Sequence, residues 1–343
     1  MKLLLNINHA GDTALRPGDE LQGTLIISGI ASQKRPHCTA TIGGRLMISV
    51  PAQVAGPNID NAVYTLFEET KQLDYGNNSS QNSPDDDVHF LPFKFQFPSH
   101  MQCSKHPQPC QLPPSTNVHN GSSKIKVEYY ITAAADKPIF GGLSTKKRVT
   151  KPLQLSSNFS STTSPAPLSI SSQPLTLQQK DCKNRLQPGP DGLPAYTPSI
   201  HVQVVHPEPP IFIRGQANRI RFDVHSPSET IGKMFVRSVN INFKTSTIAA
   251  AGSAAQRVDQ NASGVELSSL IPIDSEILEL DTGTWGRLSM LSLRPTFESC
   301  LMQIKHAAEI SVGISAGPQG SISHASSSFD VLVMDPPPSY EEI

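Results

Sequence analysis

Hydrophobic and polar residues alternate with a period of two along most of this chain. The clearest case is a run in which Ile125, Val127, Tyr129, Ile131 and Ala133 alternate with Lys124, Lys126, Glu128, Tyr130 and Thr132. Successive side chains of a β-strand point to opposite faces of the sheet. The run therefore predicts a strand with one buried face and one solvated face.

The same alternation recurs in both halves of the chain. In the first half it is carried by Leu21, Gly23, Leu25 and Ile27, after a turn at Arg16-Pro17-Gly18-Asp19, and by Phe93, Phe95 and Phe97. In the second half it is carried by Ile220, Phe222, Val224, Val239, Ile241, Phe243, Ile310, Val312, Ile314, Phe329, Val331 and Val333. No amphipathic helix longer than three turns is predicted. Short alternating runs between Pro, Gly, Ser and Asn are typical of antiparallel, immunoglobulin-like β-sandwiches, so we predict an all-β fold.

Composition divides the chain into four parts. Residues 156–199 are rich in Ser, Thr, Pro and Gln, and such a segment buries too little apolar area to offset the entropy of ordering it. We therefore predict a sandwich over 1–155, a flexible linker over 156–199, a second sandwich over 200–334 and a tail over 335–343. The polar stretch 76–87 is predicted to be an extended loop within the first sandwich.

Charge and cysteine content narrow the environment of the protein. The chain has 28 basic and 29 acidic residues, a net charge of −1, which argues against a nucleic-acid partner. The five cysteines are odd in number and scattered, a pattern that favours free thiols in a reducing compartment. No apolar run is long enough for a membrane span, and the N-terminal one is too short for a signal peptide. These features predict a cytoplasmic protein.

The end of the chain contains a peptide motif, Pro337-Pro338-Ser339-Tyr340, which matches the PPxY ligand of WW domains. Consecutive prolines favour the polyproline II conformation, so little backbone entropy remains to be lost on docking into an aromatic groove. The ring of Tyr340 would fill a neighbouring pocket. Residues 340–343 also fit a tyrosine sorting signal and, if Tyr340 were phosphorylated, a Src-homology-2 ligand. Only the WW interpretation explains Pro337 and Pro338 as well.

The first half resembles a known family. Leu91–Pro98 (LPFKFQFP), then Leu112-Pro113-Pro114-Ser115, then Val127–Ala133 are similar in order and spacing to three elements of the N-terminal domain of arrestins. The turn and strand from Arg16 to Gly23 resemble an early element of the same domain. The second half resembles the arrestin C-terminal domain only in its strand rhythm and its end at Val331–Val333. With its PPxY tail, the chain resembles an α-arrestin, or arrestin-related trafficking adaptor, of fungal style.

The resemblance implies an arrestin fold and an adaptor role without catalysis. Such a protein recruits a WW-domain HECT-type ubiquitin ligase to membrane transporter or receptor cargo, and ubiquitin attachment then promotes endocytosis or sorting. It is recruited from the cytoplasm to the plasma membrane or endosomes by peripheral association. No hydrolase elbow, phosphate-binding glycine loop or metalloprotease helix motif is present, so we predict no enzyme and no cofactor. An alternative is a structural coat component similar to retromer's arrestin-like subunit, in which the PPxY would be incidental.

Three further segments have two interpretations each. His100, Cys103, His106 and Cys110 have the residue types of a zinc site, which would make this a small metal-binding protein, or they belong to an ordinary loop. Lys146-Lys147-Arg148 is a basic cluster for phosphorylated cargo or anionic lipid, or a solvated turn. Residues 270–274 resemble a clathrin-box ligand, or they pack in or beside a strand.

Overall fold

The structure is a computed structural model and describes residues 1–8, 14–29, 35–50, 61–75, 88–102, 107–138, 144–156, 169–178, 200–216, 220–252, 254–281, 292–320 and 322–336. Within these ranges the chain is almost entirely strand, and its helical structure is one 3-10 turn, η1 (Ser228–Thr230). The prediction of an all-β fold is confirmed. No helix in these ranges is long and apolar enough to cross a membrane. The predicted loop at 76–87 lies outside the described residues.

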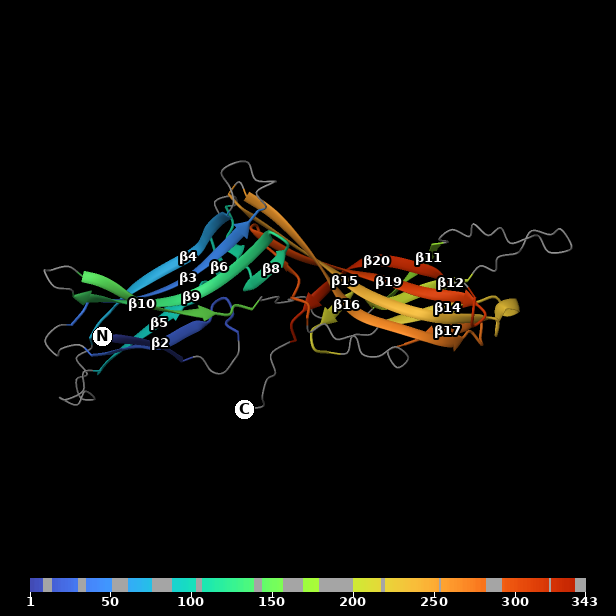
Figure 1. Ribbon diagram of the computed structural model, residues 1–343, viewed down its shortest axis with the longest axis horizontal. Coiled ribbons are helices and arrows are strands. Elements are labelled where there is room, and N and C mark those ends of the chain that lie inside the picture. The colour runs from blue at the N-terminus through green and yellow to red at the C-terminus, as the bar shows by residue number, and fades with distance from the viewer. Residues whose placement is uncertain are drawn as a thin grey trace. The chain divides into compact units, whose positions relative to one another are not determined.

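The chain forms two compact units (Figure 1). The first comprises Met1–Asn158, Thr247–Val258 and Phe297–Gln303, and the second comprises Phe159–Ser246, Asp259–Thr296 and Ile304–Ile343. Residues 247–258 and 297–303 therefore group with the first unit, although they lie within the range 200–334 predicted as the second sandwich.

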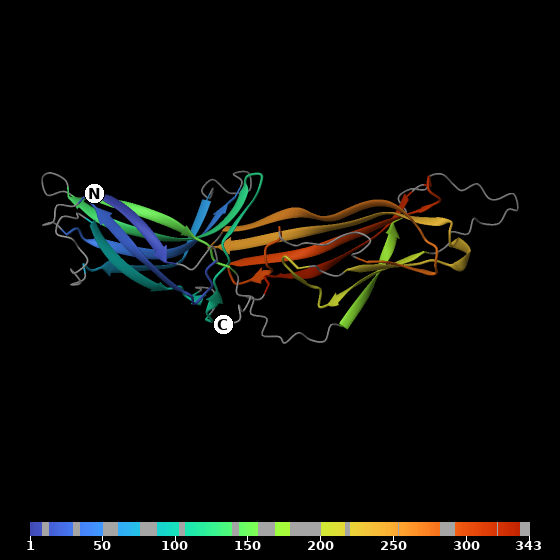
Figure 2. The same ribbon diagram turned by 90° about the horizontal axis from the view of Figure 1, so that it is seen from below.

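The first unit contains two antiparallel sheets, which Figures 1 and 2 show as separate layers. The strand order of one is β1-β2-β5, with bounds β1 (Lys2–Asn8), β2 (Glu20–Ser28) and β5 (Val88–Gln96). The order of the other is β10-β9-β3-β4, with β8 beside β9. Its strands are β3 (Cys38–Ser49), β4 (Asn61–Leu73), β8 (Thr116–Asn120), β9 (Ser123–Pro138) and β10 (Ser144–Leu153). A small ribbon pairs β6 (His100–Met101) with β7 (Cys110–Gln111).

The core of the first unit lies between these sheets and contains the apolar positions that alternation predicts. Fully or almost fully buried are Leu21, Leu25, Ile27, Phe93, Phe95, Phe97, Ile125, Val127, Tyr129, Ile131 and Ala133. Three rings join the sheets: Phe97 packs edge-on against Phe67 of β4 at 5.2 Å and against Tyr129 of β9 at 5.3 Å between ring centroids. The assignment of buried and exposed faces from the sequence is confirmed here.

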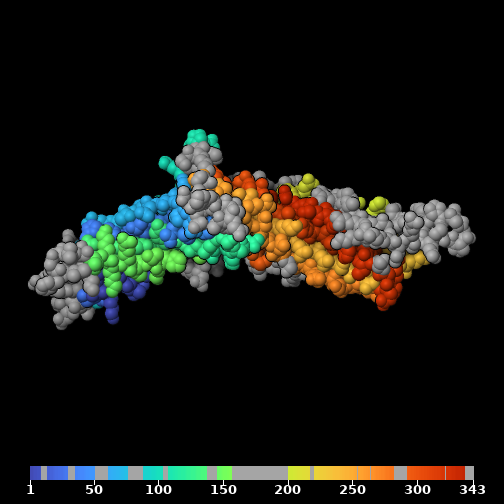
Figure 3. Space-filling view, turned by 45° about the horizontal axis from the view of Figure 1, so that its top comes forward, coloured from blue at the N-terminus to red at the C-terminus, as the bar shows by residue number. Residues whose placement is uncertain are grey.

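The opposite face of the five-stranded sheet is polar. A row of threonines crosses it: the hydroxyls of Thr41 and Thr70 are 2.8 Å apart, those of Thr132 and Thr150 are 2.9 Å apart, and Thr41 is paired with Thr132. Figure 3 shows part of this face, with β9 and β10 in green and β3 and β4 in blue. Hydrogen-bonded threonine pairs stabilise neighbouring strands while leaving the sheet surface wet.

The Leu112–Ser115 segment is held by β9 and by the residues that follow β10. The hydroxyl of Tyr129 donates to the carbonyl of Pro113 at 2.6 Å. Burial raises the pKa of Tyr129 well above its ordinary value, so the hydroxyl stays protonated and remains a donor. Ser115 donates its amide to the Leu155 carbonyl at 2.9 Å, and its Oγ accepts from the Leu155 amide at 2.9 Å. The serine of this segment therefore satisfies backbone groups within the first unit.

Two consecutive glycines on β3 leave room for two aromatic rings of β9. Gly43 is opposite Tyr130 of β9, and Gly44 is opposite Tyr129. A Cβ atom on Gly44 would lie 2.5 Å from Cε1 of Tyr129, and one on Gly43 would lie 2.8 Å from Cζ of Tyr130. Both distances are shorter than van der Waals contact, so the two rings occupy the space that side chains on β3 would need.

Replacing Gly44 by Ala should destabilise the protein more than replacing Gly43 by Ala. The Tyr129 ring beside Gly44 is buried and has no space to move, and overpacking of this kind costs about 1–3 kcal/mol. The Tyr130 ring beside Gly43 is partly exposed and can rotate into solvent. Urea unfolding measures both variants, with Thr39→Ala on the same strand as the control. Equal losses of stability for the two glycine variants would contradict this account.

The remaining strands form one branched sheet system in the order β16-β15-β19-β20-β11-β12-β14-β17. Its strands are β11 (Ser169–Gln178), β12 (His201–Glu208), β14 (Arg221–His225), β15 (Met234–Ala251), β16 (Ala254–Pro272), β17 (Ile277–Leu280), β19 (Met302–Ala316) and β20 (Ile322–Met334). Two short strands add to it: β13 (Ile211–Ile213) pairs in parallel with β20, and β18 (Phe297–Glu298) pairs with β19.

Strand β11 corrects the prediction of a linker over 156–199. Its residues 169–175 pair with β12 and its residues 176–178 pair with β20, so it joins the two parts of the sheet system. Composition misled the prediction because a backbone ladder needs only N–H and C=O groups, which serine and glutamine residues supply as well as apolar ones. The rest of that range after Ser156, residues 157–168 and 179–199, lies outside the described residues.

The apolar positions predicted for the second half form one core. Its buried members include Phe222, Val224, Val239, Ile241, Phe243, Ile310, Val312, Ile314, Phe329, Val331 and Val333. Phe212 packs edge-on against Phe243 at 6.3 Å, and His206 stacks on Phe329 at 4.4 Å between ring centroids. The alternation therefore identifies the core face of this unit correctly as well.

The second unit contains another buried histidine, and this one is uncharged. His306 on β19 is 2% exposed, and its Nδ1 is 2.9 Å from the hydroxyl of Thr245 on β15. Burial lowers the pKa of His306 to about 4, so the imidazole is neutral at physiological pH.

Stability should fall between about pH 6.5 and pH 4 because of His306. Its pKa is about 4 in the fold against an ordinary 6.5, so protons bind preferentially to the unfolded chain in this window. The contribution of His306 is complete above pH 6.5 and is lost as the pH falls, by up to about 3 kcal/mol. His306→Gln should flatten this part of a plot of melting temperature against pH. His119→Gln, at an exposed position on β8, should leave the plot unchanged; an unaltered slope in His306→Gln would refute the assignment.

Candidate functional site: the base of the C-terminal tail

Strand β20 leads directly into the predicted tail, and β13 holds its last residues. Ile211, Phe212 and Ile213 lie in register with Leu332, Val333 and Met334. The Leu332 amide donates to the Pro210 carbonyl at 2.9 Å, and the Arg214 amide donates to the Met334 carbonyl at 2.9 Å. These bonds extend sheet geometry to the last residue of β20.

Thr296 holds the other edge of β20 at the same level. Its amide donates to the Val333 carbonyl at 2.7 Å, and its Oγ1 accepts from the Val333 amide at 2.9 Å. β13 and Thr296 bind alternate residues of β20. The backbone N–H and C=O groups on both edges of β20 therefore have hydrogen-bond partners where the strand ends.

An ion pair completes this anchor at Asp335. Nη1 of Arg214 lies 2.5 Å from Oδ1 of Asp335, and the two side chains are 31% and 33% exposed. Asp335 is followed by Pro336, the last described residue. We call Arg214, Thr296, Asp335 and strand β13 the tail base. It fixes the chain up to two residues before the PPxY motif.

The predicted WW ligand itself, Pro337, Pro338, Ser339 and Tyr340, lies outside the described residues. It stays a prediction from the sequence. The tail base was not predicted, because parallel pairing of a three-residue strand with a distant strand leaves no periodic signal. The charge pair Arg214 and Asp335 is likewise 121 residues apart in the chain.

The geometry does not favour the zinc interpretation of the Cys/His loop. Cys103 and His106 lie outside the described residues. In the ribbon of β6 and β7, His100 is opposite Gln111, and Met101 is opposite Cys110. Side chains alternate along each strand, so His100 and Cys110 point to opposite faces. Among the described residues, no group of three or more Cys, His, Asp or Glu is placed to hold a metal.

The other two segments of uncertain role are parts of strands. Lys146-Lys147-Arg148 lies in β10 and is exposed, so it is not a turn. The clathrin-box-like segment lies at the end of β16. Ile273 is fully buried, its amide donates to the Met234 carbonyl at 2.9 Å, and its carbonyl accepts from the Gly232 amide at 2.7 Å. The end of this segment therefore packs beside the strand, while Leu270 within the strand is 49% exposed.

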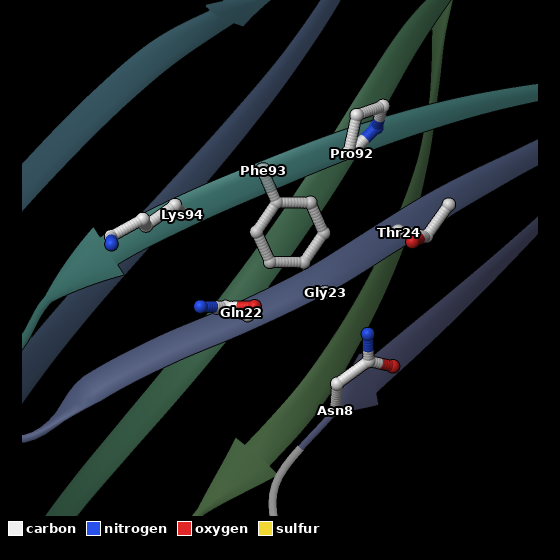
Figure 4. A pocket seen from close by; sticks show the side chains of 7 residues that line it. All are labelled: Asn8, Gln22, Gly23, Thr24, Pro92, Phe93 and Lys94. Atoms are coloured by element: carbon white, nitrogen blue, oxygen red, sulfur yellow. The ribbon is translucent and has the colours of Figure 1, made fainter.

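A shallow pocket lies on the exposed face of the β1-β2-β5 sheet, and its lining residues are Asn8, Gln22, Gly23, Thr24, Pro92, Phe93 and Lys94. Figure 4 shows the Phe93 ring reaching from β5 toward Gly23 of β2. A Cβ atom on Gly23 would lie 2.3 Å from Cζ of Phe93, so the glycine makes room for the ring. The amide, hydroxyl and ammonium groups around the pocket can hydrogen-bond a ligand. The sequence signal for this pocket is Gly23, a glycine at a position where the alternation of β2 predicts a larger apolar side chain.

No family model matches the chain, and no curated protein is significantly similar to it. Function therefore has to be inferred from the tail motif, the tail base and the surface of the sheets.

Arg214→Gln should loosen the tail base without unfolding the unit. An ion pair about a third exposed contributes about 0.2–1 kcal/mol, and the β13 ladder remains. Amide hydrogen exchange at Leu332 should therefore accelerate by up to about fivefold. Lys244→Gln removes an exposed ion pair with Glu309 elsewhere in the unit and should leave this amide unchanged. Unchanged exchange at Leu332 in Arg214→Gln would show that the ion pair does not hold the tail.

Proposed function

We propose that this protein is a non-enzymatic adaptor whose Pro337-Pro338-Ser339-Tyr340 segment binds a WW domain of a HECT-type ubiquitin ligase. The adaptor brings the ligase to membrane transporter or receptor cargo, which is then ubiquitinated and internalised or sorted. The observation that carries the proposal is the position of the motif directly after the tail base. β13, Thr296 and Arg214 fix the chain as far as Asp335, so the motif begins two residues beyond a folded edge.

This position restricts where a bound ligase domain is held. A polyproline II ribbon rises about 3.1 Å per residue, so a motif that docks in this conformation would begin within about 6 Å of Asp335. A WW domain on the motif is then tethered close to the second unit instead of moving on a long flexible chain. A short tether raises the effective concentration of ligase near whatever the folded units bind. The resemblance to α-arrestins, stated above from residues 16–23, 91–98, 112–115 and 127–133, supports the same role.

The proposal places the protein in the cytoplasm, with peripheral association at the plasma membrane or endosomes when cargo is present. Single-site affinity for the WW domain is expected to be micromolar or weaker, because a short peptide buries little area. The adaptor needs no catalytic group of its own, since the ligase supplies the chemistry of ubiquitin transfer.

Pro337→Ala and Tyr340→Ala should each abolish binding to a purified tandem-WW fragment of such a ligase. The first removes the pre-organised ring contact, and the second removes the ring that fills the tyrosine pocket. Isothermal titration with the full chain measures binding, and circular dichroism checks that melting is unchanged. Pro336→Ala, next to the motif, is the matched control and should retain binding. Wild-type affinity in the Pro337→Ala chain would refute the proposal.

Cargo uptake in cells separates the remaining interpretations of the tail. Under the proposal, Pro337→Ala loses uptake and Ile343→Ala retains it. The reverse result would identify the tail as a tyrosine sorting signal. Uptake that survives both changes would favour the coat-component alternative, in which the motif is incidental.

A further inference from the structure

We draw no further inference here: the strongest candidate, the apolar row that Leu4, Ile26 and Phe90 form across the exposed face of the β1-β2-β5 sheet, carries none because nothing in the structure shows what covers it.

Discussion

The register of antiparallel backbone pairing is the constraint on which the described features of this protein depend. Because side chains alternate between faces, a slip of one residue between two strands would exchange every buried position for an exposed one. The pairing of β3 with β9 places Gly43 and Gly44 opposite two tyrosine rings. A slip of one residue would set one of the two rings against a side chain, Tyr129 against Arg45 in one direction or Tyr130 against Ile42 in the other, so steric exclusion and the backbone ladder specify the same register.

The same constraint creates two exposed features of the structure. Leu4, Ile26 and Phe90 are distant in the chain and become one row only because β2 pairs with β1 on one edge and with β5 on the other. At the other end of the chain, parallel pairing of β13 with β20 brings Arg214 to Asp335. In both cases the backbone pairing between strands determines which exposed side chains are neighbours. The exposed side chains themselves are therefore free to change without cost to the core.

The sequence predicts which face of each strand is buried better than it predicts which strands are adjacent in a sheet. Alternation assigns Ile125 and Val127, and likewise Ile310 and Val312, to the core, because each assignment needs only the strand itself. Which strands are adjacent depends on long-range pairing, so the apolar row and the tail base could not be derived. Leu4 lies in an unbroken apolar run, Leu3-Leu4-Leu5, where no alternation shows that its side chain is exposed.

Composition was the weaker guide. It identified residues 169–178 as part of a linker, although β11 pairs there with two strands. A ladder in which both partners are backbone groups is insensitive to whether the side chains are serine or valine. The basic cluster at 146–148 was open to interpretation as a turn for a different reason. Three charged side chains on an edge strand remove the apolar alternation that marks a strand. The PPxY motif differs, because its recognition chemistry is contained in four consecutive residues and needs no fold to be read.

Under the proposed function, binding of the tail to the ligase is weak, because a single PPxY segment buries little area. Ligase bound to the tail is held close to whatever the folded units bind, so its effective concentration there replaces its bulk concentration. An adaptor that combines two weak contacts would therefore stay bound only where cargo and ligase are present together, and it would dissociate when either is lost.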